Sequence, residues 1–312
     1  MKALVTGAAG FIGSTLAERL LADQAEVVGI DCFTDYYPRA IKERNLTRLL
    51  AQPRFRFVEA RIQDANLGAL LADRTHVFHL AAQAGVRKSW GRDFAVYTVN
   101  NIEATQSLLE ACVGVRLERL VYASSSSVYG DAVPLPMRED ALPQPVSPYG
   151  VSKLAAEQLC YLYFTNYGVP ATSLRYFTVF GPRQRPDMAF HRFLQATRRG
   201  EEFRLFGNGN QTRDFTFVTD AVAATVAAGE RGVPGRVYNI GGGSRVSMNE
   251  VIELIGRVAK RRPLPVRDPA QKGDMQHTYA DTSLAQTDLG FAPSVSLEEG
   301  LAAEYRWLTE TL

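Results

Sequence analysis

The residues best suited to chemistry are Tyr149 and Lys153, which stand four positions apart. Ser147 and Pro148 precede them and are typical of a helix N-cap and a first helical residue. On a helix, residues four apart share one face, so the lysine ammonium can lie beside the phenol. A nearby cation lowers the pKa of a phenol, and Tyr149 could then act as a base near neutral pH. Taken alone, this spacing also suits an ordinary surface pair.

Three glycines spaced three apart, Gly7, Gly10 and Gly13, follow the apolar run Lys2–Thr6 and open an amphipathic helix. Glycines in this order let the backbone turn tightly and approach a pyrophosphate, while the helix N-terminus supplies N–H donors. Any turn uses glycine, so the motif gains its meaning from the order strand, glycines, helix.

Asp31 ends the second strand-like run, about where a dinucleotide-binding fold places its ribose-binding acid. A carboxylate there accepts hydrogen bonds from ribose hydroxyls and repels a 2′-phosphate, which favours NAD over NADP. A helix cap or a solvated loop acid is the alternative interpretation. The serine run Ser124–Ser127 closes a later strand-like run, where hydroxyls can bind a substrate alcohol or carbonyl. A polar exit from the strand would give the same pattern.

These residues need a scaffold of alternating strands and helices. The strand-like runs are Lys2–Thr6, Glu26–Asp31, Phe55–Ala60, His76–Ala82, Leu120–Ser125 and Ala171–Phe177. Helical patterns lie between them, including Ala95–Cys112. The alternation predicts an α/β fold, a Rossmann-type doubly wound parallel sheet with helices on both faces.

The regular alternation of strand and helix patterns stops at Thr178, after which prolines and glycines interrupt it. We expect residues 1–177 to form an NAD-binding Rossmann domain that also receives about 214–240. Residues 178–312 are expected to form mainly a smaller α/β substrate-binding lobe, interleaved with the first domain. Helices are predicted there over Met248–Lys260 and Leu297–Thr309.

Composition excludes several classes of protein. Lys and Arg number 35 against 33 Asp and Glu, and the formal net charge of +2 argues against nucleic acid as the main partner. Three cysteines without a CxxC pair argue against disulfides and favour a cytoplasmic location. No Cys/His spacing predicts a metal site, and His76 and His79 should face opposite sides of a strand. There is no signal-peptide pattern and no apolar stretch long enough for a bilayer, so no membrane partner is expected.

Taken together, the motifs resemble those of the extended short-chain dehydrogenase/reductases, in the NAD-dependent nucleotide-sugar epimerase/dehydratase family. The resemblance runs over nearly the whole chain, and its motifs occupy residues 7–13, 31, 79–83, 100, 124–130, 149–153, 175–182, 213–215 and 239–242. Within the family, the chain most resembles the UDP-glucuronate 4-epimerases, through residues 33–37, 82–87 and 178–188. UDP-glucose 4-epimerases commonly carry Asn where this chain has Thr178.

The resemblance implies NAD-dependent epimerisation at C4 of a UDP-sugar through a transient 4-keto intermediate, with UDP-glucuronate giving UDP-galacturonate. The alternative is a UDP-glucose/UDP-galactose or N-acetylhexosamine 4-epimerase. The dehydratases that the chain resembles carry an acidic pair where it has Ser126 and Ser127. Elimination needs an acid and a base beside the carbons concerned, so these serines argue for epimerisation without dehydration.

By resemblance, the catalytic residues are Ser125, Tyr149 and Lys153. The cofactor would contact Gly7, Gly10, Phe11, Ile12, Gly13, Asp31, Ala81, Ala82, Asn100, Tyr149, Lys153 and Tyr176. The substrate would contact Ser125, Ser126, Ser127, Arg87, Thr178, Arg185, Phe206, Arg213 and Asp274, of which Phe206, Arg213 and Asp274 hold the UDP. Arg61 stands where the family often has an adenine-facing acid, and Gln271 and Lys272 stand where an arginine is common.

The resemblance also implies a homodimer. Helices near Asn100–Cys112 and Tyr149–Thr165 would pack across a twofold axis, with Tyr161, Leu162 and Phe164 as apolar surface.

Overall fold

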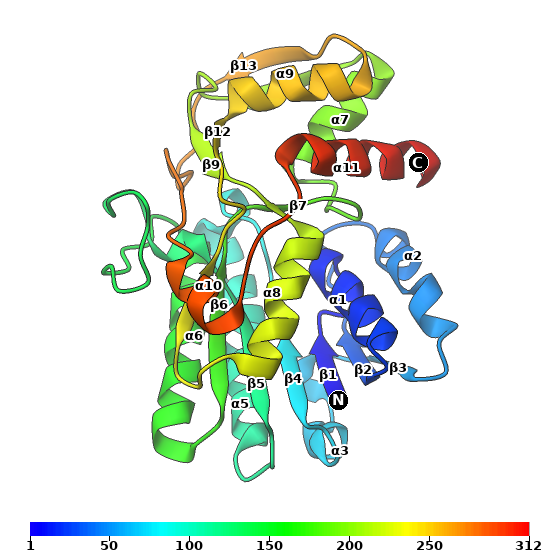
Figure 1. Cartoon of the computed structure of the whole chain (residues 1–312), viewed down its shortest axis with the longest axis vertical. Coiled ribbons are helices and arrows are strands. Elements are labelled where there is room, and N and C mark those ends of the chain that lie inside the picture. The colour runs from blue at the N-terminus through cyan, green and yellow to red at the C-terminus, as the bar shows by residue number, and fades with distance from the viewer. Residues whose placement is uncertain (312) are drawn as a thin grey trace.

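The centre of the molecule is a seven-stranded parallel sheet, seen in a computed structural model that describes residues 1–311 (Figure 1). Its strands lie in the order β11, β6, β5, β4, β1, β2, β3, and every neighbouring pair is parallel. Their bounds are β1 Lys2–Thr6, β2 Glu26–Asp31, β3 Phe55–Glu59, β4 His76–His79, β5 Arg119–Ser125, β6 Ala171–Tyr176 and β11 Val237–Ile240. The predicted fold class is therefore confirmed.

Helices cover both faces of the sheet because neighbouring strand residues point to opposite sides. Val5 belongs to one apolar core and Leu4 to the other. The first core includes residues of α1 (Phe11–Ala22), α2 (Arg39–Leu50) and α8 (Val218–Arg231). The second includes residues of α3 (Leu67–Leu71), α5 (Ala104–Cys112) and α6 (Pro148–Tyr167). This double burial explains why the central strands are almost uniformly apolar.

The two strand histidines face opposite cores, as predicted. His76 Nε2 lies 3.2 Å from the carbonyl oxygen of Gly229 in α8. His79 Nε2 lies 2.9 Å from the Thr105 hydroxyl in α5. Both imidazoles are buried structural groups, and burial lowers the pKa of His79 to about 3.

The second half of the chain builds a lobe above the sheet in the view of Figure 1. It contains α7 (Ala189–Arg199), α9 (Met248–Ala259), α11 (Leu297–Thr311) and the parallel pair β8 (Glu202–Phe206) and β13 (Leu264–Asp268). The two predicted helices of this part are present, with ends within two residues of those expected. Ser247 caps α9 through a capping box with Glu250, which fixes where that helix begins.

Short elements connect the lobe with the sheet. They are β7 (Val179–Phe180) paired with β10 (Thr216–Phe217), β9 (Thr212–Asp214) paired with β12 (Arg245–Ser247), and α10 (Ser283–Leu289). The segment after β10 returns to the sheet: α8 packs on α1, and β11 pairs with β6. The later part of the chain thus contributes a strand and a helix to the body built around the seven-stranded sheet.

Two predicted elements differ from the structure. The strand expected over His76–Ala82 ends at His79, because its neighbour β1 ends at Thr6, whose hydroxyl accepts the Ala81 N–H at 3.1 Å. The helix expected over Ala95–Cys112 consists of α4 (Phe94–Tyr97), a π-helix over Thr98–Glu103, and α5. Hydrophobic periodicity does not reveal a π turn, and such turns often lie at functional sites.

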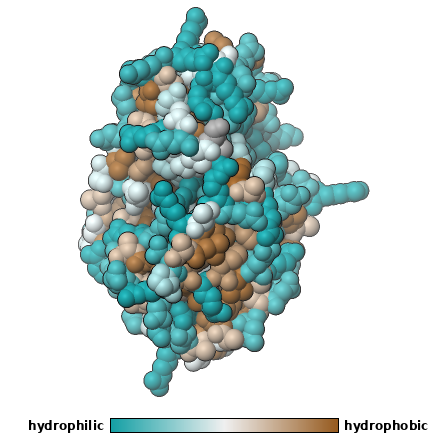
Figure 2. All heavy atoms as spheres, turned by 90° about the vertical axis from the view of Figure 1, so that its right-hand side faces the viewer, coloured by the Kyte–Doolittle hydropathy of each residue, from teal (hydrophilic) through white to brown (hydrophobic). Residues whose placement is uncertain are grey.

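Polar side chains prevail on one broad face of the molecule (Figure 2). Figure 2 shows the side of the molecule that lies on the right in Figure 1, where teal side chains dominate and apolar ones surface as smaller patches. Within residues 1–311, no helix is long and apolar enough to span a membrane. In the same range, no group of three or more His, Cys, Asp or Glu side chains could hold a metal ion.

Candidate active site

A cleft opens at the carboxyl ends of the central strands, where ligands bind in folds of this kind. Every residue predicted to contact the cofactor lines it: Gly7, Gly10, Phe11, Ile12, Gly13, Asp31, Ala81, Ala82, Asn100, Tyr149, Lys153 and Tyr176. These residues come from segments up to 169 positions apart, and parallel strand ends bring them to one edge of the sheet.

The turn between β1 and α1 depends on glycine. Gly7 has a φ of +70°, and a Cβ at this position would lie 2.9 Å from the Ala81 nitrogen. A Cβ on Gly13 would collide with the carbonyl oxygen of Gly7. No side chain caps the start of α1, so its first N–H groups remain available for an anion.

Asp31 is fixed at the far wall of the cleft. Its Oδ2 accepts the Ala9 N–H at 3.1 Å, and its Oδ1 accepts the Phe33 N–H at 2.9 Å. Each carboxylate oxygen can accept more than one hydrogen bond, so capacity remains for a ribose diol. Together with the glycine turn, this donor and acceptor set fits a dinucleotide.

Tyr149 and Lys153 lie on the first turns of α6. Ser147 caps this helix by accepting the Gly150 N–H at 3.1 Å, and Pro148 is its first residue, as predicted. The Lys153 ammonium lies 4.4 Å from the centre of the Tyr122 ring, and burial lowers the pKa of Lys153 to about 7. Burial raises the pKa of Tyr149, while Ser125 and then Arg185 lower it. The sequence predicts Lys153 as the cation that lowers the pKa of Tyr149. In the structure the cation that lowers it is Arg185, which the sequence analysis did not assign to that role.

The serine run forms a corner where β5 ends. Ser125 Oγ accepts the Ser127 N–H at 3.1 Å and so starts a short helical turn. Ser125 and Ser126 are buried, and Ser127 is partly exposed. Ser125 pairs in register with Tyr176 of β6, two residues before Thr178. The predicted sugar-binding hydroxyls therefore come from the ends of two adjacent strands.

Arg185 reaches the same cleft as Tyr149. Its guanidinium donates to both carboxylate oxygens of Asp187, at 3.0 Å each, and lies 5.5 Å from the centre of the Tyr36 ring. The Tyr36 hydroxyl donates to Asp187 as well, at 3.2 Å. Sequence reasoning did not identify Tyr36 or Asp187 as site residues, although both stand in the motifs that carried the resemblance.

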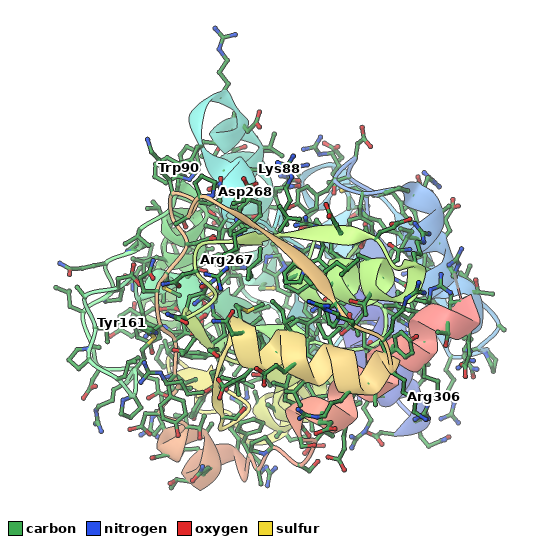
Figure 3. The ribbon with its side chains drawn as sticks, turned by 90° about the horizontal axis from the view of Figure 1, so that it is seen from above. Lys88, Trp90, Tyr161, Arg267, Asp268 and Arg306 are labelled. Atoms are coloured by element: carbon green, nitrogen blue, oxygen red, sulfur yellow. The ribbon has the colours of Figure 1, made fainter. Side chains whose placement is uncertain are left out.

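Four other predicted substrate residues gather where the lobe meets the turn Arg87–Ser89. The Arg87 guanidinium donates to Asp274 at 2.6 Å and lies 4.1 Å from the centre of the Phe206 ring. The Arg213 guanidinium donates to the carbonyl of Gln276, two residues after Asp274, at 3.2 Å. We call Arg87, Phe206, Arg213 and Asp274 the lobe cluster. In Figure 3, the labelled Lys88 and Trp90 lie on the same side of the lobe as Arg267 and Asp268, the last two residues of β13.

Two further cleft features could not be read from the sequence. Tyr97 lies edge-to-face with Tyr149, with ring centres 6.2 Å apart, and its hydroxyl donates to the Gly85 carbonyl at 2.7 Å. Gln63 lines the cleft and is held by the Val99 carbonyl at 2.7 Å, whereas Arg61 is exposed. Gln63 is thus a polar cleft residue two positions after Arg61.

Comparison with known proteins agrees with this geometry. The model of the NAD dependent epimerase/dehydratase family matches residues 3–241. The chain belongs to this family. Three solved structures of a similar enzyme, the UDP-glucuronic acid 4-epimerase of Bacillus cereus, contain NAD, and NAD is the cofactor of this chain.

Individual family members are similar over the full length. One is the uncharacterized UDP-glucose epimerase YtcB of Bacillus subtilis, 43% identical, with 99% of this chain and 98% of that protein covered. Another is the UDP-glucuronate 4-epimerase of Thermodesulfobacterium geofontis, 38% identical, with 99% and 96% covered. The B. cereus UDP-glucuronic acid 4-epimerase with UDP-glucuronic acid and NAD is 45% identical, with both chains fully covered and a TM-score of 0.97.

Proposed function

We propose that this chain is a UDP-glucuronate 4-epimerase, which converts UDP-glucuronate to UDP-galacturonate. The position of Arg185 carries the proposal, since a guanidinium in the cleft beside Tyr149 suits a sugar that bears a carboxylate. The Arg185 guanidinium has five N–H donors. Two of them bind Asp187, and the others remain for a second carboxylate. The names of the T. geofontis and B. cereus relatives support this substrate.

In the proposed reaction, Tyr149 takes the proton from the sugar 4-hydroxyl, and Ser125 holds that oxygen by a hydrogen bond. Lys153, four residues on in the same helix, supplies positive charge that favours the phenolate. Bound NAD supplies a reversible hydride acceptor for C4. Asp31 and the first turn of α1 hold the cofactor in place.

Inversion requires that the 4-keto sugar turn over while the nucleotide stays fixed. The lobe cluster serves the fixed part: Phe206 offers an aromatic face, Arg213 a guanidinium suited to phosphate, and Asp274 an acceptor for hydroxyls. Because Arg87 already occupies the Phe206 face and the Asp274 carboxylate, it must move aside or share these contacts when UDP binds.

A glucuronate substrate adds a hazard, since its 4-keto form is a β-keto acid that can lose carbon dioxide. The site must hold the carboxylate so that the breaking bond stays poorly aligned with the carbonyl π system. Arg185 and the hydroxyls of Ser126, Ser127 and Thr178 serve this purpose in the proposal. A neutral CH₂OH group would gain no charge-assisted bond there.

Product analysis by NMR tests the proposal, with UDP-glucuronate and UDP-glucose offered separately to the purified protein and NAD. We expect UDP-galacturonate, little UDP-pentose and little change in UDP-glucose. Rapid conversion of UDP-glucose with little use of UDP-glucuronate would instead assign the chain to the UDP-glucose 4-epimerases.

We also propose that the enzyme is a cytoplasmic homodimer. Residues 1–177 with 214–240 would form its cofactor domain, and the remainder of 178–312 its UDP-sugar lobe.

The apolar side chains of Tyr161 and Leu162 support the dimer, since they are 54% and 50% exposed on the outer face of α6. Tyr161 lies at the rim of the molecule in Figure 3. Leu162→Glu should convert a dimer to a monomer in light scattering after size exclusion, and an unchanged mass would refute this interface.

A further inference from the structure

Glu157 is a buried carboxylate one helical turn beyond Lys153 on α6. It is 2% exposed, and the Lys153 side chain is 3% exposed beside it in the core. A charged side chain in such a place costs free energy unless it is paired. The partners of Glu157 therefore show what the carboxylate does.

Three hydrogen bonds hold the carboxylate. Its Oε1 accepts Arg175 Nη2 at 2.6 Å, and its Oε2 accepts Arg175 Nε at 3.1 Å. The same Oε2 accepts the Ser124 hydroxyl at 2.6 Å. Ser124 lines the cofactor cleft and directly precedes Ser125. Glu157 thus ties the helix of Tyr149 to the strand end that carries the serine corner.

Arg175 fixes the carboxylate from the other side. It is buried on β6, its guanidinium lies 4.6 Å from the centre of the Tyr129 ring, and it donates to the Glu139 carbonyl at 3.3 Å. Tyr129 in turn donates to Asn239 of β11 at 2.7 Å. The ion pair is therefore rigidly held by two strands of the sheet.

Five groups face or neighbour the Lys153 ammonium. Tyr122 of β5 lies under it, His79 of β4 is near, and Tyr149, Cys160 and Glu157 share its helix. Burial keeps Tyr122, Cys160 and His79 neutral, because it raises the pKa of the phenol and the thiol and lowers that of the imidazole. Burial lowers the pKa of Lys153, and Cys160 and then Glu157 oppose this. Since the Cys160 thiol is neutral, the ion-paired Glu157 carboxylate is the negative charge that favours charged Lys153.

We propose that Glu157 is a positioning residue of the epimerase: its carboxylate supplies the negative charge one helical turn from buried Lys153 and holds the Ser124–Ser125 corner against α6. The inference rests on the proposed function, in which a charged Lys153 supports the Tyr149 phenolate. It assigns the Glu157–Arg175 pair to catalysis, where an ordinary core ion pair would contribute only to stability.

The pH profile of kcat for Glu157→Gln tests this role. Activity needs charged Lys153 and is lost as pH rises through the pKa of that lysine. Without the carboxylate this pKa falls, so the alkaline limb should move to lower pH by about one unit. Glu157→Asp keeps the charge and should keep the alkaline limb near its parental position, with a lower kcat from the shorter reach.

Asp220→Asn is the matched control, because Asp220 is also a buried carboxylate held by hydrogen bonds, from Ser294 and Val295 to α8, and does not line the cleft. Its alkaline limb should not move. Should Glu157→Gln leave Arg175 unpaired and fail to fold, Glu157→Gln/Arg175→Met removes both charges of the pair and should still show the shift. A folded variant without the Glu157 carboxylate whose alkaline limb matches the parent would overturn the proposal.

The two proposals fail in different ways. If the parental protein epimerises neither UDP-glucuronate nor UDP-glucose, the proposed function is wrong. If the parental protein is active and the Glu157→Gln limb stays in place, only the role of Glu157 is wrong.

Discussion

At the residue scale, burial works against charge at both members of the central pair. It lowers the pKa of Lys153 to about 7 and raises that of Tyr149, so burial opposes the charged form of each. Ser125 and Arg185 counteract this at the phenol, and Glu157 counteracts it at the lysine. A positively charged nicotinamide in the cleft would act in the same direction. The site is therefore expected to become fully reactive only with its cofactor present.

Tyr149→Phe should lower turnover of UDP-glucuronate by about 10³-fold, because it removes the group proposed to move the proton. NAD binding should stay close to the parental value, since the ring that packs edge-to-face with Tyr97 is retained. Product formation by NMR and NAD titration by calorimetry measure the two quantities. Near-parental turnover would exclude Tyr149 as the base.

Arg185→Ala should lower kcat/KM for UDP-glucuronate by about 10² while UDP affinity stays within about twofold, because only the carboxylate loses a charge-assisted bond. Arg185→Lys, which keeps the charge but loses the fork, should lie between the two. Steady-state kinetics with UDP titration provide the comparison. Equal losses in sugar turnover and UDP binding would return Arg185 to a phosphate-binding role.

At the scale of elements, the cofactor site depends on how two helices begin and on one irregular turn. The first N–H groups of α1 are left free because no side chain caps it, whereas Ser147 caps α6 and so fixes Tyr149 near its start. The π-helix over Thr98–Glu103 brings Asn100 to the cleft. Each helix thus contributes through its end or an irregular turn.

Gly13→Ala should weaken NAD binding by more than about tenfold, because its Cβ would collide with the Gly7 carbonyl and open the turn. Gly68→Ala is the control: Gly68 lies on α3, does not line the cleft, and its Cβ would meet only the Asn66 side-chain oxygen at 3.7 Å. Calorimetric titration with NAD, after circular dichroism has established folding, measures the difference. Equal affinities for the two variants would contradict this account of the turn.

At the scale of the whole molecule, the end of the chain secures the segment that carries Arg185. The Glu304 carboxylate of α11 accepts the Gly181 N–H at 3.0 Å and is fully buried. A little farther on, Arg183 donates to Glu18 of α1 at 2.7 Å. The segment between β6 and α7 is thus held from the lobe and from the sheet at once. The position of this segment determines where the Arg185 side chain enters the cleft.

Glu304→Gln should raise the thermal midpoint more at about pH 8 than at about pH 5. Burial raises the pKa of Glu304 well above 4.5, so its contribution to stability is present at low pH and is lost as pH rises towards the folded-state pKa. Glutamine keeps an oxygen for Gly181 and carries no such loss. Thermal unfolding at both pH values checks this, and a constant difference between the proteins would show that Glu304 does not titrate.

Local patterns sufficed for much of this protein. Alternating strands and helices, the glycine order from Gly7 to Gly13, the acid at Asp31 and the capped start of Tyr149–Lys153 are short-range features, because chain neighbours decide them. The predictions were wrong about where the strand of His76 ends and about the middle of the helix that contains Asn100. There, the length of β1 and a π turn decide the geometry, and periodicity carries no signal for either.

The sequence by itself determined the fold class, the family resemblance and the set of predicted cofactor residues, all of which line the cleft. Only the tertiary structure decided how those residues act on one another. It placed Arg185 where it acts on the Tyr149 phenol, set Lys153 over the Tyr122 ring, and joined Arg87 to Phe206 and Asp274. It also paired Glu157 with Arg175 in the core. The physical reason is that pKa shifts and ion pairs depend on burial and on distances across the fold, which spacing along the chain does not contain.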